Sequence, residues 1–405
     1  MREKIFLIIK GFVAVFVVLS LAGGPIFIQD YFSQLALPLI MFCVGCTFNG
    51  KTNNEDISFI GRQVRVYYWP FWCWSLFFLI VHNLFSLLHV VKAPLYGVHE
   101  FFQRLWDITF SMSGYDSELA GILWILRALL ISSVVYVLVL NLLRHIRPTD
   151  SVERSISILA ICSTLLVLWK IPTGLYVKCL PDGGILELIS IVFVAIGSLY
   201  NKIPRRIRFN LYIVVFCFIL TILGSIYYPV RIEPNIDVWH FIVLLIISFC
   251  GFVVVRTLAW TLVFKFKSVG NILSYIGKHC FCVITFSVLS FKFVDALEIV
   301  WYGLPWTKMA DSYLLWSNSF DVFWLLRIAS GICLPLLIIY AYQRLSQRVD
   351  LSLGNLLKAL LMISVRLTIL IIVSVKYIAR AIWSGILGTI NALKDIVKAS
   401  NPREE

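Results

Sequence analysis

The chain has 405 residues, of which 60% are hydrophobic and only 14% charged, and its formal net charge is +13. Soluble domains are about half apolar and about a quarter charged, so this composition excludes a soluble globular protein. The apolar runs are continuous rather than alternating, which favours spanning helices over a closed barrel. We therefore expect an all-α protein, a polytopic transmembrane helix bundle.

The first apolar run follows Arg2 and Lys4 and ends at Gly23-Gly24-Pro25, which is a poor signal-peptidase site, so we expect a retained helix. Apolar runs between charged or Gly/Pro/Asn-rich breaks predict about ten spans. These are residues 5–22, 32–48, 66–90, 119–142, 155–171, 184–200, 208–228, 238–262, 271–296 and 320–342.

A further long apolar segment, residues 354–399, is interrupted by Arg366, Lys376 and Arg380. An eleventh span would export several basic residues, so residues 376–398 favour an amphipathic helix lying on the membrane. We divide the chain into a transmembrane domain, residues 1–350, and a membrane-associated helical tail, residues 351–405.

Basic residues are distributed unevenly between alternate loops, which predicts the orientation. With the N-terminus in the cytoplasm, sixteen fall inside and six outside, as the positive-inside rule requires. The inside set is Arg2, Lys4, Lys51, Arg62, Arg65, Arg144, Arg147, Arg154, Lys202, Arg205, Arg206, Arg208, Lys265, Lys267, Arg344 and Arg348; the outside set is Lys92, Arg104, Lys170, Lys178, Arg231 and Lys308. The net charge therefore indicates a lipid bilayer as partner and not nucleic acid.

Apart from the tail, six basic residues remain inside the predicted spans: Lys10, Arg127, Arg256, Lys278, Lys292 and Arg327. A charge at the bilayer centre costs about 2.5–3.5 kcal/mol on insertion scales, so it usually has a partner or a function. Arg127 follows Trp124 by three residues and shares its helix face. Either it pairs with a structural carboxylate such as Glu118 or Glu187, or the basic groups together mark an anion-binding or reaction pathway.

Ten cysteines are present, and most lie inside apolar runs, where a thiol usually behaves as a small buried hydrophobic group. Cys43-x-x-Cys46 has no companion pair and no clustered histidine. We therefore expect no metal site and no bound cofactor.

Five ordered segments together resemble a known family of membrane proteins. They are IIKGFVAVFVVLSLAGGP, LALPLIMFCVGCTFNGK, GRQVRVYYWPFW, LWILRALL and LSYIGKHCFCVITFSVLSFKFV, within about residues 5–345. Their order and spacing resemble the acyltransferase-3 family of bacterial inner-membrane proteins that acylate, often acetylate, surface polysaccharides. The resemblance implies acyl transfer from acetyl-CoA or another acyl-CoA, as co-substrate, to a sugar hydroxyl of a glycan or its lipid-linked precursor.

The resemblance also identifies three positions at which family members carry a histidine and this chain does not. Eleven residues after the basic Lys10 stands Leu21, the position before Leu37-Pro38 is Ala36, and the position midway along the helix that follows the YIGK segment is Ser287. A histidine in such a site acts as a base for the poorly nucleophilic hydroxyl and contributes about 10²–10⁴-fold to the rate. None of these three residues can act as a base near pH 7.

Other residues are candidates for that role or for donor binding. The weak substitutes for the base are His240, Asp116 and Glu118, while each of the six histidines also fits an interfacial or hydrogen-bonded structural position. The family-like basic and aromatic positions are Lys10, Arg62, Arg65, Trp124 and Arg127. Arg62 and Arg65, three residues apart, suit donor phosphates because arginine binds them through two parallel hydrogen bonds, but they also fit topology-setting charges.

Three functions remain open at this point. The first is an O-acyltransferase with an altered or relocated base. The second is a catalytically silent homologue that binds donor or glycan in a polysaccharide assembly pathway. The third is a polysaccharide transporter or polymerase; the absence of a visible repeat weakens the transporter, and the short loop at 91–118 weakens the polymerase.

Overall fold

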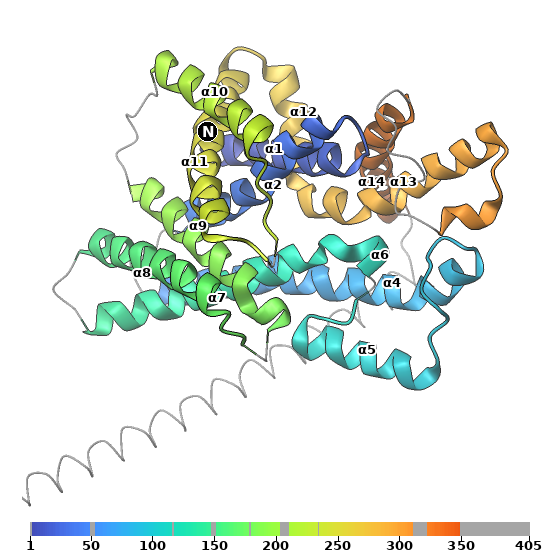
Figure 1. The fold of residues 1–405 in the computed structure, drawn as a ribbon, viewed down its shortest axis with the longest axis horizontal. Helices are drawn as coiled ribbons and strands as arrows, with labels where there is room; N and C mark the ends of the chain where they lie inside the picture. Colours follow the sequence, from blue (N-terminus) through green and yellow to red (C-terminus); the bar gives the residue numbers. More distant parts are fainter. Residues whose placement is uncertain are drawn as a thin grey trace, which may run out of the picture. The chain divides into compact units, whose positions relative to one another are not determined.

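The computed structural model describes residues 2–48, 53–115, 117–146, 151–177, 180–202, 210–233, 235–310 and 322–348. Within these ranges all regular structure is helical, as Figure 1 shows, so the expected all-α class is confirmed. The tail expected at residues 351–405 lies outside the described residues. The chain groups into two compact units, residues 1–337 and 338–405, and the cavity and ion pairs considered below belong to the first.

Nine helices in the described part of the chain are long and apolar enough to cross a membrane. They are Glu3–Leu21, Ile26–Cys46, Glu55–Leu87, Trp124–Ile146, Val152–Thr173, Pro181–Lys202, Val238–Phe264, Cys280–Tyr302 and Phe323–Ala341. A tenth helix, α10 (Leu211–Tyr227), is apolar but has only 17 residues. Each predicted span therefore overlaps one apolar helix, and the polytopic bundle is confirmed.

The predicted ninth span, residues 271–296, is wrong in its bounds. The structure has a short helix α12 (Lys267–Lys278), a break at His279, and then the spanning helix α13 (Cys280–Tyr302). The apolar residues on both sides of Gly277-Lys278-His279 predicted one span, because a single glycine and two polar residues do not by themselves require a helix break. The break separates an amphipathic helix with an exposed face, including Lys267 and Asn271, from a helix buried along much of its length.

The third span is one long helical stretch with an internal irregularity. It consists of α3 (Asn53–Gln63), a π-helical segment η1 (Val64–Tyr68) and α4 (Trp69–Leu87). Pro70 explains the widened turn, because proline lacks an N–H and its ring clashes with the carbonyl four residues earlier. The helix ends at Leu87, so the predicted end at residue 90 lies in the loop that follows.

The centre of the bundle is formed by α1 (Arg2–Leu21) and α2 (Ile26–Cys46), which pack on each other. A Cβ added at Gly277 of α12 would lie 1.8 Å from the Leu7 carbonyl oxygen of α1. One added at Gly45 of α2 would lie 2.0 Å from the Val194 carbonyl oxygen of α9 (Ile185–Lys202). Glycine thus brings both helix pairs into backbone contact, as small residues do in membrane bundles.

The remaining helices surround this centre. Helix α9 packs on α8 (Val152–Thr173) and α7 (Trp124–Ile146), and α10 packs on α11 (Val238–Phe264). Between α4 and α7 the chain forms α5 (Val98–Ser111), α6 (Ser117–Ala120) and the 3₁₀ turn η2 (Gly121–Leu123). The last described helix is α14 (Phe323–Arg348).

Candidate functional site

A cavity of about 620 Å³ lies at the C-terminal end of α1 and the N-terminal half of α2. Its wall combines Val17 and Leu21 of α1, Ala36 of α2, Trp124 of α7 and Val288 of α13 with residues of the intervening loops. This volume falls within the range of small-molecule binding pockets, roughly 300–1,000 Å³. The wall is mostly apolar with a few polar groups, which is the composition expected of a pocket that orients one ligand.

Of the three positions that the sequence resemblance singled out, two line this cavity. Leu21 and Ala36 line it, and Ser287 directly precedes the lining residue Val288. Ser287 itself is buried and donates its hydroxyl hydrogen bond to the Ile284 carbonyl, 2.9 Å away, within its own helix. Leu21, Ala36 and Val288 thus bring three segments far apart in sequence to one wall, and neither Leu21 nor Ala36 can accept a proton near pH 7.

Glu118 supplies a carboxylate to the same cavity. Its Oε2 accepts a hydrogen bond of 2.7 Å from the backbone N–H of Lys92, which also lines the cavity. Glu118 is exposed, whereas Leu119 beside it is buried, so the short helix α6 is fixed while its carboxylate stays accessible. Of the three substitutes named from the sequence, Glu118 is the one that lines the cavity, and Asp116 lies outside the described residues.

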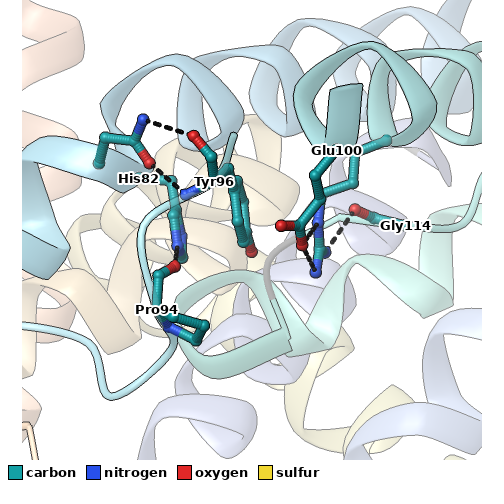
Figure 2. Close-up of polar contacts among 7 residues, drawn as sticks. His82, Pro94, Tyr96, Glu100 and Gly114 are labelled. Atoms are coloured by element: carbon teal, nitrogen blue, oxygen red, sulfur yellow. Dashed lines mark hydrogen bonds and ion pairs between the residues drawn. The ribbon is translucent and has the colours of Figure 1, made fainter. Parts of the chain in front are cut away.

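Three polar residues of α4, His82, Asn83 and Ser86, form hydrogen bonds with the loop that carries Lys92. His82 Nε2 lies 3.1 Å from the Pro94 carbonyl oxygen, and the Ser86 hydroxyl donates to the Ala93 carbonyl at 3.0 Å. Asn83 bonds both backbone groups of Tyr96, whose ring stacks on the His82 ring at 3.5 Å between centroids (Figure 2). These contacts give His82 a structural role and hold the donor of the Glu118 hydrogen bond in place.

Trp124 adds an aromatic wall, and the segment after α10 adds further polar groups. Arg231 and Glu233 line the cavity together with Trp124. The Arg231 guanidinium forms an ion pair with Asp30 of α2, which ties this segment to the bundle. An aromatic ring beside carboxylates and hydrogen-bond donors is a chemistry that suits a ligand with several hydroxyl groups and an apolar face.

Lys292 of α13 is a cavity residue that the sequence analysis did not assign to a site. Its side chain is buried, its Nζ donates to the Met309 carbonyl at 2.7 Å, and its charge acts on Asp295 and Glu118. Arg327 of α14 bonds Asp295 at 2.9 Å and Glu298 at 2.5 Å. This cluster could have been predicted from the sequence, because the charged residues Lys292, Asp295 and Glu298 are spaced three apart and therefore share one helix face.

Arg127 does not line this cavity and instead pairs with a carboxylate of α9. Its Nε donates to Glu187 Oε1 of α9 at 3.0 Å, and both side chains are 3% exposed. This is the pairing with a structural carboxylate that the sequence left open, and the partner is Glu187 rather than Glu118. The ion pair lies beside a second, smaller apolar cavity of about 250 Å³ that Glu187 and Lys170 line.

The other basic positions named from the sequence, Lys10, Arg62 and Arg65, lie away from the cavity lining. Lys10 precedes the cavity residue Val17 by seven positions, or about 10 Å of helix. Lys10 lies close enough to the buried Cys43 and Cys280 thiols for its charge to interact with them. The same thiols and Arg62 interact electrostatically with the Tyr67 hydroxyl. Arg62 donates to the Thr47 carbonyl at 3.5 Å, and both Arg62 and Arg65 are exposed. None of these three basic residues is part of the cavity lining.

His240, named from the sequence, and His279 have structural surroundings as well. His240 lies against Tyr228, with 3.4 Å between Nδ1 and the hydroxyl oxygen, and it is not part of the cavity lining. Burial, with a smaller contribution from the Lys278 ammonium, lowers the pKa of His279 below its usual range. His279 stands at the break between α12 and α13, where the lower pKa keeps its ring neutral near pH 7.

Among the described residues, no group of three or more His, Cys, Asp or Glu side chains is placed to hold a metal ion. The cavity instead offers two accessible carboxylates, those of Glu118 and Glu233, together with an aromatic wall and cationic groups. Compared with known proteins, the chain matches no protein-family model, no curated protein and no solved structure.

Proposed function

We propose that the protein is an integral membrane O-acyltransferase that transfers an acyl group, in the first instance acetyl, from an acyl-CoA to a sugar hydroxyl. The acceptor is a surface polysaccharide or its lipid-linked precursor, and the setting is a bacterial inner membrane with the N-terminus in the cytoplasm. The observation that carries the proposal is the meeting of Leu21, Ala36, Glu118 and Trp124 at one cavity.

In this proposal Glu118 replaces the missing histidine as general base. Its carboxylate takes the proton of the acceptor hydroxyl while the hydroxyl oxygen attacks the thioester carbonyl carbon. The new C–O bond forms, the C–S bond breaks, and the proton passes from Glu118 to the leaving thiolate, so the carboxylate is regenerated. The backbone N–H of Lys92 orients the carboxylate through the 2.7 Å hydrogen bond, as a base held by a second group requires.

The cavity wall supports the acceptor class. The Trp124 ring provides a face on which a sugar ring can stack, while Glu118 and Glu233 can accept hydrogen bonds from its hydroxyls. Lys10, Arg62 and Arg65 lie outside this wall and suit the phosphates of the donor, which arginine binds through two parallel hydrogen bonds. Donor and acceptor would then approach the reacting centre from different directions.

The proposal is tested in cells by the ester content of the surface glycan. Deleting the gene and replacing Glu118→Gln are both expected to remove the same acyl ester, measured by mass spectrometry of purified glycan. Glu153→Gln is the matched control, because Glu153 is an exposed glutamate of α8 outside the cavity lining, and the ester should persist. An ester level that is unchanged in the deletion strain would contradict the proposal.

The apolar side chains of Leu21 and Ala36 favour a second candidate, a catalytically silent homologue that binds donor or glycan without transfer. This candidate predicts that glycan binding to the purified protein depends on Trp124, while the ester content of the glycan is the same in the deletion strain. The two candidates therefore give opposite results in the same deletion.

A further inference from the structure

Helix α5 presents an apolar stripe on its outward face. Val98, Phe102, Trp106 and Phe110 follow one another at intervals of four, and each is 61–77% exposed. Four positions correspond to about one helical turn, so these side chains lie on one side of the helix. A stripe of four large apolar side chains on a single helix needs an apolar partner.

The position of α5 is set by contacts with the spanning helix α4 at both ends. Near its end, the Tyr68 hydroxyl donates to the Thr109 carbonyl at 2.8 Å and the Trp72 indole donates to the Thr109 hydroxyl at 3.3 Å. Near its start, Tyr96 stacks on His82. The helix thus runs antiparallel to α4, beside residues 68–82 of that span, and Figure 1 shows the two helices next to each other.

The chain then turns back instead of crossing. The 14 residues of α5 extend about 21 Å, which is too short for a hydrocarbon core of about 30 Å. Met112 ends the helix in a left-handed conformation, with φ 49°, and Tyr115 packs edge-on against Phe71. By Glu118 the chain has returned to Lys92, on the side from which it came.

Two charged groups of α5, Arg104 and Glu100, pair with each other, and the Glu100 side chain is 43% exposed. Arg104 pairs with Glu100 at 3.0 Å, donates to the Gly114 carbonyl at 3.2 Å and lies over the Tyr96 ring at 4.1 Å (Figure 2). Arg104 thus has its partners within the protein, as a charge at membrane depth requires, while His99 and Gln103 beside the stripe are exposed. The neighbouring span α4 also exposes apolar side chains, including Ile80 and Leu84.

We propose that α5 is a re-entrant membrane helix whose stripe of Val98, Phe102, Trp106 and Phe110 contacts the hydrocarbon of the bilayer. The segment 91–118, expected from the sequence to be an extramembrane loop, then enters the membrane and leaves it on the same side. The segments on both sides of α5 contribute Lys92 and Glu118 to the cavity, so the bilayer helps to fix this wall. The inference concerns lipid contact and does not depend on the proposed reaction.

The test measures the depth of a fluorescent label in proteoliposomes. Single thiols are introduced as Val98→Cys, Phe102→Cys and Phe110→Cys in a variant whose Cys162, Cys179 and Cys333 are replaced by serine. The parent variant without an added thiol gives the background. Ile80→Cys on α4 is the hydrocarbon control, and Glu153→Cys on α8 is the aqueous control. Quenching is measured with nitroxides at two depths on the lipid chains and with aqueous iodide.

The expected result is quenching by chain nitroxides at all three positions, with Phe110→Cys deeper than Val98→Cys. Three outcomes would overturn the inference. Quenching by iodide like that of Glu153→Cys would place the stripe in water, and equal shallow depths would describe a helix lying flat on the membrane. Shielding from both quenchers, with cross-linking of Phe102→Cys between copies, would assign the stripe to a second copy of the chain.

Discussion

At the scale of single residues, the charges within the bundle and at its cavity divide into two groups. Arg127 and Arg327 have carboxylate partners within hydrogen-bond distance inside the bundle. Glu118 and Lys292, by contrast, line the cavity. An intramembrane arginine is therefore not sufficient to mark a site, since pairing can account for it, whereas a charge at the wall of a cavity can act on a ligand.

The role of Arg127 can be measured by removing the pair in two steps. Arg127→Met leaves Glu187 charged and buried, so we expect a loss of about 3–5 kcal/mol in the free energy of unfolding. Arg127→Met with Glu187→Leu should recover most of that stability, because an apolar replacement of a buried pair is often neutral or better. Unfolding in detergent with added denaturant gives the values. If the double variant folds but loses glycan acylation, Arg127 has a substrate role beyond the pair.

A histidine placed at the cavity should take over from Glu118. In a Glu118→Gln background, Leu21→His is expected to restore acyl transfer partly, because residue 21 faces the same cavity and imidazole titrates near neutral pH. Leu19→His is the control, since Leu19 lies on the same helix but outside the cavity lining. Equal activity of the two histidine variants would contradict the assigned position of the reacting centre.

At the scale of helices, the close approach of α1 and α12 depends on two glycines. Gly11 and Gly277 face each other's backbone, and a Cβ on Gly277 would lie 1.8 Å from the Leu7 carbonyl oxygen. The short helix α12 can pack this tightly because the chain breaks at His279 instead of continuing into α13. The sequence has Gly277, Lys278 and His279 at the break, but these residues also fit a continuous helix, and the contact with α1 is long-range.

Gly277→Ala should therefore separate the two helices and lower the free energy of unfolding by about 1–3 kcal/mol, the usual cost of overpacking. The control is Gly61→Ala on α3, where no atom lies within 4 Å of an added Cβ. There we expect no loss, and a gain of about 0.4–1 kcal/mol from helix propensity and the unfolded chain. The same unfolding measurement compares them, and an equal effect at both sites would contradict the packing argument.

At the scale of the whole molecule, the number and approximate limits of the spans follow from apolar runs alone, because hydrocarbon imposes helices of nearly constant length. The residues that line the cavity could be predicted from the sequence only in part. The resemblance selected Leu21, Ala36 and Trp124, while Glu118 was one of three substitutes and Lys292 was not assigned. Their meeting depends on the packing of α1, α2, α6 and α13, which no local pattern in the sequence encodes.

The orientation of the chain is a separate prediction. The excess of basic residues, sixteen against six, predicts that the N-terminus and the loop at Lys265 face the cytoplasm. A membrane-impermeant maleimide added to intact cells should therefore label Lys308→Cys and not Lys265→Cys, both of which are exposed positions. Labelling of the second and not the first would reverse the topology.

The central claim is that acyl transfer takes place at the cavity with Glu118 as base. The most direct measurement uses purified protein in proteoliposomes with radiolabelled acetyl-CoA and the glycan acceptor of the native cell. We predict transfer of label to the glycan by the unaltered protein, a decrease of about 10²–10⁴-fold in Glu118→Gln, and no change in Glu153→Gln. Equal transfer by the unaltered protein and Glu118→Gln, or no transfer by either, would contradict the account.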